Sequence, residues 1–234
     1  MRNNHDDKTI TVRKGNSIAY YRLMDGMQQF WDDHWREQRQ RAVPMLTRSA
    51  KGHLGRGTVA AALVKHLPRS GVILEAGCGL GQYVLALRAR GYDCRGIDFA
   101  EETVQWLRNL YPTVPISRGD ILNLPFADGS IAAYLSFGVV EHFEDGPDRA
   151  LHEARRVLVD GGHLVLSVPQ VFPARWHRAL PETTAIPHGY RFYQYAFSPR
   201  DFHRRLTGVG FAVIAEYGYS SAFGIELLFP FTQR

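Results

Sequence analysis

The sequence predicts an α/β fold with a mostly parallel sheet, and three observations support this class. Short apolar segments and amphipathic segments alternate from residue 72 to residue 168, which is the pattern of successive βαβ units. The segment 131–136 is apolar almost throughout, as expected of a strand that is buried on both faces. Hydrophobic residues make up 45% and charged residues 22% of the 234-residue chain, a balance that excludes disordered and fibrous proteins.

The expected elements begin with an N-terminal segment. Residues 1–19 are polar and are expected to be loose, and apolar spacing of three and four residues predicts a helix over 20–41. A second helix is expected at 58–67, just before Pro68. The core elements then alternate, with strands expected at 72–75, 94–97, 116–118, 131–136 and 163–168 and helices at 81–90, 101–110 and 148–158.

The C-terminal third departs from this alternation. Residues 169–197 hold four prolines and many aromatic residues, which indicates a small cap inserted after the fifth strand. Ser198 followed by Pro199 predicts the start of a helix that Gly208 and Gly210 end. Two closing strands, 211–217 and 225–229, are expected to form a hairpin with one antiparallel strand. We therefore expect one domain over 1–234, divided into 20–68, 70–168, 169–197 and 198–234.

Composition limits where the protein works and what it binds. The longest nearly apolar run, 131–140, is shorter than the roughly 20 residues that span a bilayer, and the first residues lack the apolar stretch of a secretory signal. We expect a cytoplasmic protein in which Cys78 and Cys94 are free, buried thiols. The net charge of +5 suits nucleic acid, a membrane surface or an acidic small molecule, but the arginines are scattered, which favours an ordinary charged surface.

A glycine-rich turn follows the first core strand. Glycines at 77, 79 and 81 let the backbone approach a ligand at the carboxyl end of a parallel sheet. Gln82 stands where the dinucleotide-binding fingerprint has glycine or alanine. Glu75 would repel a pyrophosphate and would attract an ammonium group, such as that of S-adenosylmethionine. The turn therefore favours a methionine-derived nucleoside over a dinucleotide.

Two further acids follow the next two strands. Asp98 stands where a carboxylate accepts both ribose hydroxyls, and Phe99 is placed to pack on adenine. Asp120 is placed to accept the adenine amino group. Any one of these acids could instead cap the following helix, but three acids at successive strand ends favour one site.

Several segments, in the right order, resemble class I S-adenosylmethionine-dependent methyltransferases, and most of all the broad group (methyltransferase type 11) that includes the quinone-biosynthesis methyltransferases. The matching segments are LEAGCGLG at 74–81, GIDF at 96–99, GDI at 119–121, LPF at 124–126, SFGVVEH at 136–142, RRVL at 155–158 and GG at 161–162. The resemblance implies a Rossmann-like sheet of seven strands with helices on both faces and a reversed hairpin at one edge.

The resemblance also implies S-adenosylmethionine as the cofactor, S-adenosylhomocysteine as its product, and roles for particular residues. Glu75 and the turn of Gly77, Cys78 and Gly79 would hold the methionine part. Asp98 would hold the ribose, Phe99, Asp120 and Ile121 would meet the adenine, and Phe137 and Gly138 would line the sulfonium. Gly138 stands where quinone O-methyltransferases carry the first acid of a Glu-x-x-Glu-His metal pattern, so only Glu141 and His142 remain and we predict no metal.

Methyl transfer from a sulfonium needs alignment and exclusion of water, and it needs a base only where the acceptor carries a proton of high pKa. His142 follows the fourth core strand and is the first candidate base, although it could equally be a structural histidine; His188 and Tyr193 of the cap are weaker candidates. The candidate acceptor-binding residues are Tyr21, Trp31, Trp176, His177, Tyr190 and Arg191. The aromatic members could equally form the core of the cap.

These observations lead to a methyltransferase that acts on oxygen or nitrogen of a small molecule with an aromatic or apolar part. The alternatives are an RNA or protein methyltransferase, a membrane-peripheral enzyme of quinone biosynthesis, and a non-catalytic binder that keeps the nucleotide fold. We expect no nucleic-acid partner, because neither an Asn-Pro-Pro-Tyr-like motif nor an appended RNA-binding module is present in the sequence. A homodimer is left open.

Overall fold

The computed structural model describes residues 9–221 and 224–233. The strands are β1 (Thr9–Lys14), β2 (Ser17–Leu23), β3 (Val72–Ala76), β4 (Asp93–Asp98), β5 (Ile116–Arg118), β6 (Ile131–Phe137), β7 (Leu158–Pro169), β8 (Tyr190–Ala196), β9 (Phe211–Val213), β10 (Tyr217–Ser221) and β11 (Gly224–Gln233). The helices are α1 (Met27–Ser49), α2 (Thr58–His66), α3 (Gln82–Ala89), α4 (Glu101–Leu110), the 3₁₀ turn η2 (Val140–His142), α5 (Asp148–Val157), α6 (Pro173–Arg178) and α7 (Pro199–Val209).

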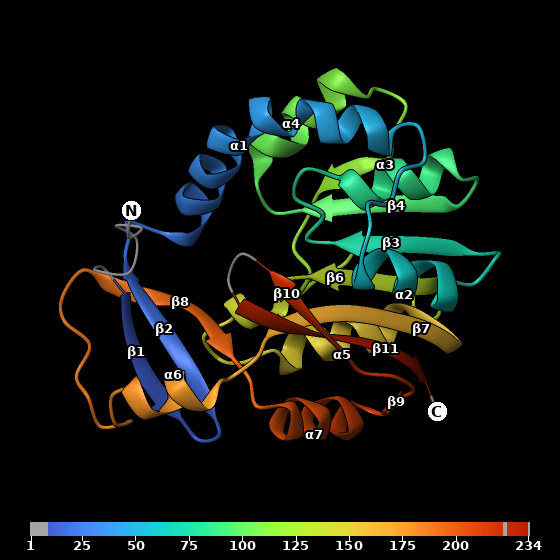
Figure 1. The fold of residues 1–234 in the computed structure, drawn as a ribbon. Coiled ribbons are helices and arrows are strands. Elements are labelled where there is room, and N and C mark those ends of the chain that lie inside the picture. Colours follow the sequence, from blue (N-terminus) through green and yellow to red (C-terminus); the bar gives the residue numbers. More distant parts are fainter. Residues whose placement is uncertain (1–8, 222–223, 234) are drawn as a thin grey trace.

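The central sheet confirms the predicted fold class. Its strands lie in the order β10-β11-β7-β6-β3-β4-β5, and β9 pairs with β11 beside that path (Figure 1). The strands from β3 to β7 pair in parallel. Strand β11 is antiparallel to β7, and β10 is antiparallel to β11. The mostly parallel sheet with an antiparallel closing hairpin is thus present, and its strands outside the hairpin are close to those expected.

Helices cover both faces of this sheet, each over its own apolar core. On one face α3 and α4 lie over β3 and β4, and on the other α5 and α7 lie under β7 (Figure 1). The buried residues of α5, which are Ala150, Leu151, Ala154 and Val157, recur at helical spacing, so a single stripe of that helix meets the sheet. In the described part of the chain, no helix is both long enough and apolar enough to cross a membrane.

A second, three-stranded antiparallel sheet corrects the prediction for the N-terminal segment. Residues 9–14 and 17–23 are strands β1 and β2, where a loose segment and the start of a helix were expected, and β8 of the cap completes this sheet in the order β1-β2-β8 (Figure 1). Residues 17–21 are all buried, because β2 is covered on both of its faces. Its partner β8 lies about 170 residues further along the chain, so local periodicity carried no sign of the pairing. Residues 1–8 lie outside the described residues.

Several element boundaries also differ from the prediction. Strand β7 begins at Leu158, where a strand over 163–168 was expected, and β11 covers Gly224–Gln233, where a strand over 225–229 was expected. Helix α1 begins at Met27 and continues to Ser49, past Pro44. The single strand expected at 211–217 is two strands, β9 and β10. Both pair with β11, since β11 is long enough to hold β10 along residues 224–228 and β9 along residues 231–233. Helix α7 begins as predicted, with the Ser198 hydroxyl accepting the Asp201 N–H at 3.2 Å, and it ends at Gly210 with a φ of 99°.

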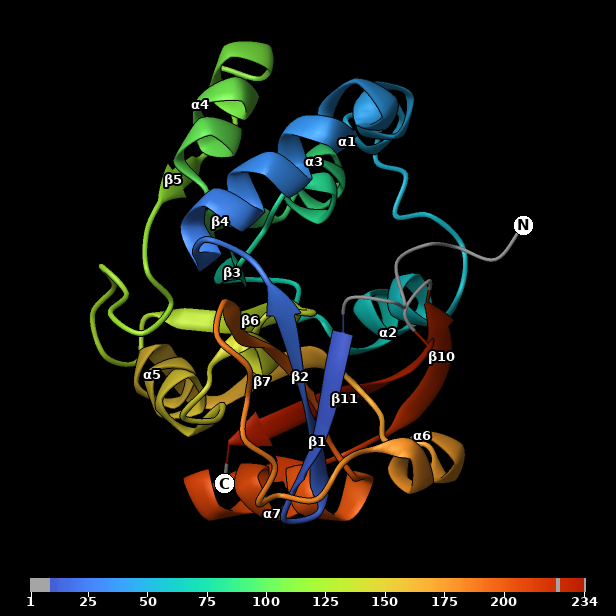
Figure 2. The same ribbon diagram turned by 90° about the vertical axis from the view of Figure 1, so that its left-hand side faces the viewer.

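The small sheet and α1 lie at the end of the central sheet to which β3, β4 and β6 point (Figures 1 and 2). Helix α1 packs on α3 and α4, and the Arg36 guanidinium donates to the Glu102 carboxylate of α4 at 2.8 Å. The carboxyl ends of the parallel strands are therefore enclosed by α1 on one side and by the cap on the other.

Candidate active site

The turn between β3 and α3 lies on the backbone of β4. The N–H groups of Gly77 and Cys78 donate to the Ile97 carbonyl at 2.8 and 3.0 Å. Gly77 has a φ of 76°, and a Cβ atom there would lie 2.5 Å from a methyl group of Val139. Gly79 has a φ of 49°, and its Cβ would lie 2.7 Å from the ring of Trp35 on α1. Glycine is therefore required at both positions, both by conformation and by close approach.

The side chain of Glu75 is almost wholly buried beneath this turn. It is 4% exposed, and its carboxylate accepts the Val84 N–H of α3 at 3.0 Å. Burial raises the pKa of Glu75 to about 8, against a smaller lowering by that hydrogen bond. A nearby positive charge would lower this pKa, so the carboxyl can respond electrostatically to a cationic ligand. The predicted contact with the methionine part stays a prediction.

A pH-dependent stability follows from the burial of Glu75. Its pKa in the folded chain, about 8, lies above its ordinary value of 4.5, so the folded chain holds the proton more tightly than the unfolded chain. The resulting stabilisation is complete below about pH 4.5 and is lost as the pH rises through 8. The free energy of unfolding of the wild-type chain should therefore fall by on the order of a few kcal/mol between pH 5 and pH 8, and Glu75→Gln should not show this fall. Urea unfolding at the two pH values measures both.

The matched control is Glu101→Gln, which changes an exposed carboxyl at the start of α4. This variant is expected to follow the wild-type pH dependence. If wild-type and Glu75→Gln protein lost equal stability between the two pH values, the burial argument would be wrong.

Asp98 closes the other side of the turn. One carboxylate oxygen accepts the Gly79 N–H at 2.6 Å and the other accepts the Ala100 N–H at 2.8 Å. Asp98 is 7% exposed, and burial raises its pKa. The next residue, Phe99, leaves 43% of its surface exposed. Each carboxylate oxygen keeps a second lone pair for a hydroxyl donor, and the phenyl ring offers a surface on which a base can stack.

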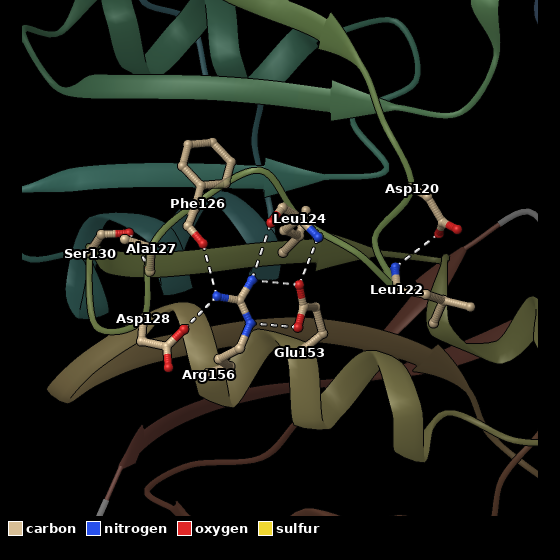
Figure 3. A network of polar contacts seen from close by, with 9 residues as sticks. All are labelled: Asp120, Leu122, Leu124, Phe126, Ala127, Asp128, Ser130, Glu153 and Arg156. Atoms are coloured by element: carbon tan, nitrogen blue, oxygen red, sulfur yellow. Dashed lines mark hydrogen bonds and ion pairs between the residues drawn. The ribbon is translucent and has the colours of Figure 1, made fainter.

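The loop after β5 carries the third acid. Asp120 is exposed, and one of its carboxylate oxygens accepts the Leu122 N–H at 2.9 Å (Figure 3). The adjacent Ile121 is buried. The Asp120 carboxylate thus fixes the backbone of the loop with one oxygen, and its other oxygen stays available to accept a hydrogen from a ligand. The carboxylates of Asp98 and Asp120 follow adjacent strands, as predicted.

Arg156 of α5 holds the far part of the same loop in place. Its guanidinium donates to the carbonyls of Leu124 and Phe126, to Asp128, and through two bonds to Glu153 (Figure 3). Glu153 also accepts the Leu124 N–H at 2.6 Å.

Removal of this guanidinium is expected to destabilise the fold. Arg156→Ala leaves the half-buried carboxylate of Glu153 and two loop carbonyls without their donor, which costs about 2 kcal/mol after allowance for partial solvent exposure. Urea unfolding measures this loss. Arg149→Ala on the exposed side of α5 is the control and is expected to change stability by less than about 0.5 kcal/mol. Equal stabilities of the two variants would contradict the role given to Arg156.

His142 lies just beyond the carboxyl end of β6, in η2. Its Nδ1 is 2.6 Å from the Tyr193 carbonyl, which can only accept a hydrogen, so Nδ1 carries the proton and donates. Burial lowers the pKa of His142 to about 4, against a smaller raising by this hydrogen bond. The ring is therefore neutral at pH 7. Phe137, which ends β6, packs its ring against Tyr83 of α3 with centroids 5.0 Å apart.

Aromatic side chains from α1 and β8 meet around His142. The ring centroid of Trp31 on α1 lies 4.8 Å from that of His142, and the centroid of Tyr193 on β8 lies 5.1 Å from it. Phe30 contacts Tyr193 at 5.4 Å, and the Arg22 guanidinium lies 4.0 Å from the centre of the Tyr193 ring. We call Phe30, Trp31, His142 and Tyr193 the aromatic cluster.

Residues 74–166, which run from within β3 to within β7, match the methyltransferase domain family. The glycine turn, Asp98 and Asp120 all fall in this segment. The chain carries a class I S-adenosylmethionine-dependent methyltransferase domain.

Relatives agree with this assignment over the same part of the chain. A protein of Mycolicibacterium smegmatis, named a probable S-adenosylmethionine-dependent methyltransferase, is 36% identical over 97 residues, which cover 42% of this chain and 37% of that protein. A human protein named probable tRNA methyltransferase 9B is 36% identical over 99 residues, which cover 42% of this chain and 21% of that protein. The match thus spans well under half of either relative.

Solved methyltransferases share the fold. A Haloferax volcanii methyltransferase, in complex with the activator Trm112, superposes with a TM-score of 0.65 at 18% identity, covering 89% of this chain and 99% of that one. The 1,6-didemethyltoxoflavin-N1-methyltransferase of Burkholderia thailandensis, with S-adenosylhomocysteine bound, has a TM-score of 0.59 at 15% identity and covers 97% of this chain and 99% of that one.

S-adenosylmethionine is the cofactor of this methyltransferase domain, and the residues at the turn fit it. The two oxygens of Asp98 have acceptor capacity for a diol, and Phe99, which is 43% exposed, offers an open ring on which a base can stack. Among the described residues, no three His, Cys, Asp or Glu side chains are grouped to hold a metal ion, and independence from metal stays a prediction.

The fold brings only some of the predicted catalytic and acceptor-binding residues together. Trp31, His142 and Tyr193 meet in the aromatic cluster. Tyr21 lies on the other face of the small sheet, where it contacts Phe192. Trp176 of α6 packs against the same small core as Phe30 and Tyr193, with the Arg13 guanidinium over its ring. The remaining candidates lie apart from the cluster: Tyr190 packs with Phe192, and His177, His188 and Arg191 are exposed.

Sequence reasoning missed two residues at the site. Arg22 reaches Tyr193 only through the pairing of β2 with β8, for which the sequence holds no local signal. Trp35, which its spacing along α1 had made a candidate for closing the pocket, covers Gly79. His34 packs between Trp31 and Trp35, with ring centroids 5.3 and 4.8 Å away, and the three-residue spacing from Trp31 was the available signal.

Proposed function

We propose that this methyltransferase acts on an oxygen or nitrogen atom of a small molecule that has an aromatic or apolar part. The observation that carries the proposal is the aromatic cluster, which lies at the carboxyl end of β6 next to Phe137 and Gly138. The half-buried rings of Phe30 and Trp31 offer apolar surface to an aromatic acceptor, and the buried rings of Tyr193 and His142 pack against them.

The enclosure of the site supports a small acceptor. Helix α1 crosses the glycine turn with Trp35, and β8 brings Tyr193 to the same place from the cap. Side chains from both ends of the chain thus surround the reacting position, which excludes water and restricts the orientation of the acceptor. A bulky macromolecular substrate would have to displace one of these two elements.

The donor supplies an activated methyl group on a sulfonium, so the protein residues have only to align the acceptor and hold its proton. His142 is our candidate for this role, because its Nδ1 is fixed on the Tyr193 carbonyl, which leaves Nε2, 4.0 Å from the Glu141 carboxylate, as the nitrogen that can accept a hydrogen. With a pKa of about 4, it orients a hydroxyl or amine more effectively than it removes a proton. His188 is exposed in the cap, and we give it no part in the reaction.

The test is transfer of a labelled methyl group from S-adenosylmethionine to a panel of phenols, aromatic amines, carboxylates and quinone precursors. We expect label in aromatic or apolar acceptors and none in bulk RNA or in protein. Measurement of S-adenosylhomocysteine binding by calorimetry separates a wrong acceptor class from a wrong cofactor. Label in RNA alone would overturn the small-molecule proposal and leave the methyltransferase assignment in place.

RNA methylation is the second candidate, because the human relative is named a tRNA methyltransferase and the chain has a net charge of +5. Binding of tRNA that weakens by orders of magnitude as salt rises from about 50 to 200 mM would support it. A cytoplasmic location, a homodimer and an activator partner like that of the Haloferax protein are further proposals, and gel filtration with multi-angle light scattering tests the homodimer.

A further inference from the structure

An open groove of about 540 Å³ lies where α1, the loop after it and α3 meet. Met45 and Arg48 line it from the last turns of α1, His53 and Arg56 from the loop, and Gln82 and Tyr83 from the start of α3. None of the predicted cofactor-binding residues lines this groove.

The groove is cationic. Arg48, His53 and Arg56 are its titratable basic side chains, and in the described part of the chain none of the three makes an ion pair or a side-chain hydrogen bond. Among the described residues, no acidic side chain lines the groove. The first turn of α3, whose backbone N–H groups form the positive end of that helix, adds charge of the same sign. Unbalanced like charges on one surface favour an anionic ligand.

The cationic loop is held in a fixed place. The Arg90 side chain donates to the Gly52 carbonyl at 2.6 Å, and the His53 N–H donates to the Arg48 carbonyl at 3.1 Å. Leu54 is 8% exposed and belongs to the core beneath α1 and α3. The basic side chains of the loop therefore extend from an anchored backbone.

The groove borders the reacting end of the site. Tyr83, which lines it, contacts Phe137 at the end of β6. Asp98 and Asp120, in contrast, follow β4 and β5, which lie on the other side of β3 in the sheet order. The groove is thus on the side of the acceptor and not on that of the adenosine.

We propose that the groove binds a carboxylate or phosphate group of the methyl acceptor, which makes the substrate an acidic molecule with an apolar part. Arg48 and Arg56 would pair with the anion, and the apolar part would extend past Tyr83 toward Phe137. This proposal rests on the proposed function, because it names the substrate class of the same site.

The test compares benzoate with benzamide, two probes of the same size that differ in charge, on protein saturated with S-adenosylhomocysteine. Binding is followed by NMR at 50 and 300 mM salt. We expect benzoate to bind at least tenfold more tightly than benzamide at low salt, and we expect high salt to reduce this preference. In Arg48→Gln/Arg56→Gln the preference should disappear. Arg41→Gln, an exposed arginine of the same helix outside the groove, should retain it.

S-adenosylhomocysteine affinity is measured on the same variants and should stay within about twofold of wild type. Equal binding of benzoate and benzamide to the loaded wild type would overturn the groove proposal alone. The double variant could instead lose affinity for S-adenosylhomocysteine while it keeps its affinity for 5′-methylthioadenosine, which lacks the methionine carboxylate. That result would show that the two arginines bind the cofactor, and it would also overturn the groove proposal. Wild-type protein that does not bind S-adenosylhomocysteine would instead contradict the proposed function.

Discussion

Asp98→Ala is expected to weaken S-adenosylhomocysteine binding more than tenfold, a loss of at least about 1.4 kcal/mol. The alanine removes the predicted acceptor for the ribose hydroxyls. It also removes the partner of the Gly79 and Ala100 N–H groups, so the turn loses the carboxylate that orders it. Calorimetric titration of the variant measures the effect.

Two matched variants separate these contributions. Asp93→Ala, at the exposed start of β4, should bind S-adenosylhomocysteine like wild type. Asp98→Asn keeps one strong acceptor oxygen and should lose less affinity than the alanine variant. Wild-type affinity in Asp98→Ala would refute the assignment of the ribose to this carboxylate.

Gly77→Ala is expected to cost at least about 2 kcal/mol of stability and to reduce S-adenosylhomocysteine binding below detection. Its methyl group would lie 2.5 Å from a Val139 methyl group, at a backbone φ of 76° that alanine disfavours. Chemical denaturation and calorimetry measure the two effects.

Gly129→Ala is the matched control, because Gly129 has a φ of 59° and a Cβ there would meet nothing within 4 Å. Gly129→Ala should lower the free energy of unfolding by only about 1 kcal/mol, which is the cost of a positive φ for alanine, and it should leave S-adenosylhomocysteine binding unchanged. The double variant Gly77→Ala/Val139→Ala should recover part of the lost stability, since it removes both methyl groups that the new side chain would strike. Equal losses in Gly77→Ala and Gly129→Ala would show that close packing at the turn does not matter.

The central sheet was predictable because its signals are local. Strands β3 and β6 are short apolar runs, helices α4 and α5 each have an amphipathic stripe, and Ser198 marks the start of α7 through a cap that spans three residues. The glycine turn and the acids after β4 and β5 were predictable for the same reason. Their placement follows from the parallel sheet, in which the carboxyl ends of neighbouring strands lie together.

The rest depends on pairings that are distant in sequence. Tyr20 and Tyr21 fit a helical or an extended pattern equally well, and only the pairing of β2 with β8 decides for a strand. The same pairing places Tyr193 on the face of the small sheet that contacts His142, and it places Tyr21 on the opposite face. Similarly, the cationic groove combines Arg48, Arg56 and Tyr83 from segments that only the packing of α1 on α3 brings together.

The most direct test of the account is a calorimetric titration of the wild-type chain with S-adenosylhomocysteine and, separately, with NADH. The turn beside Glu75 and Asp98 should bind S-adenosylhomocysteine at micromolar concentration and show no heat with NADH, because Gln82 stands where a dinucleotide-binding turn has glycine or alanine and the buried Glu75 carboxyl offers a pyrophosphate no positive charge. Saturable binding of NADH, with no response to S-adenosylhomocysteine, would contradict the account.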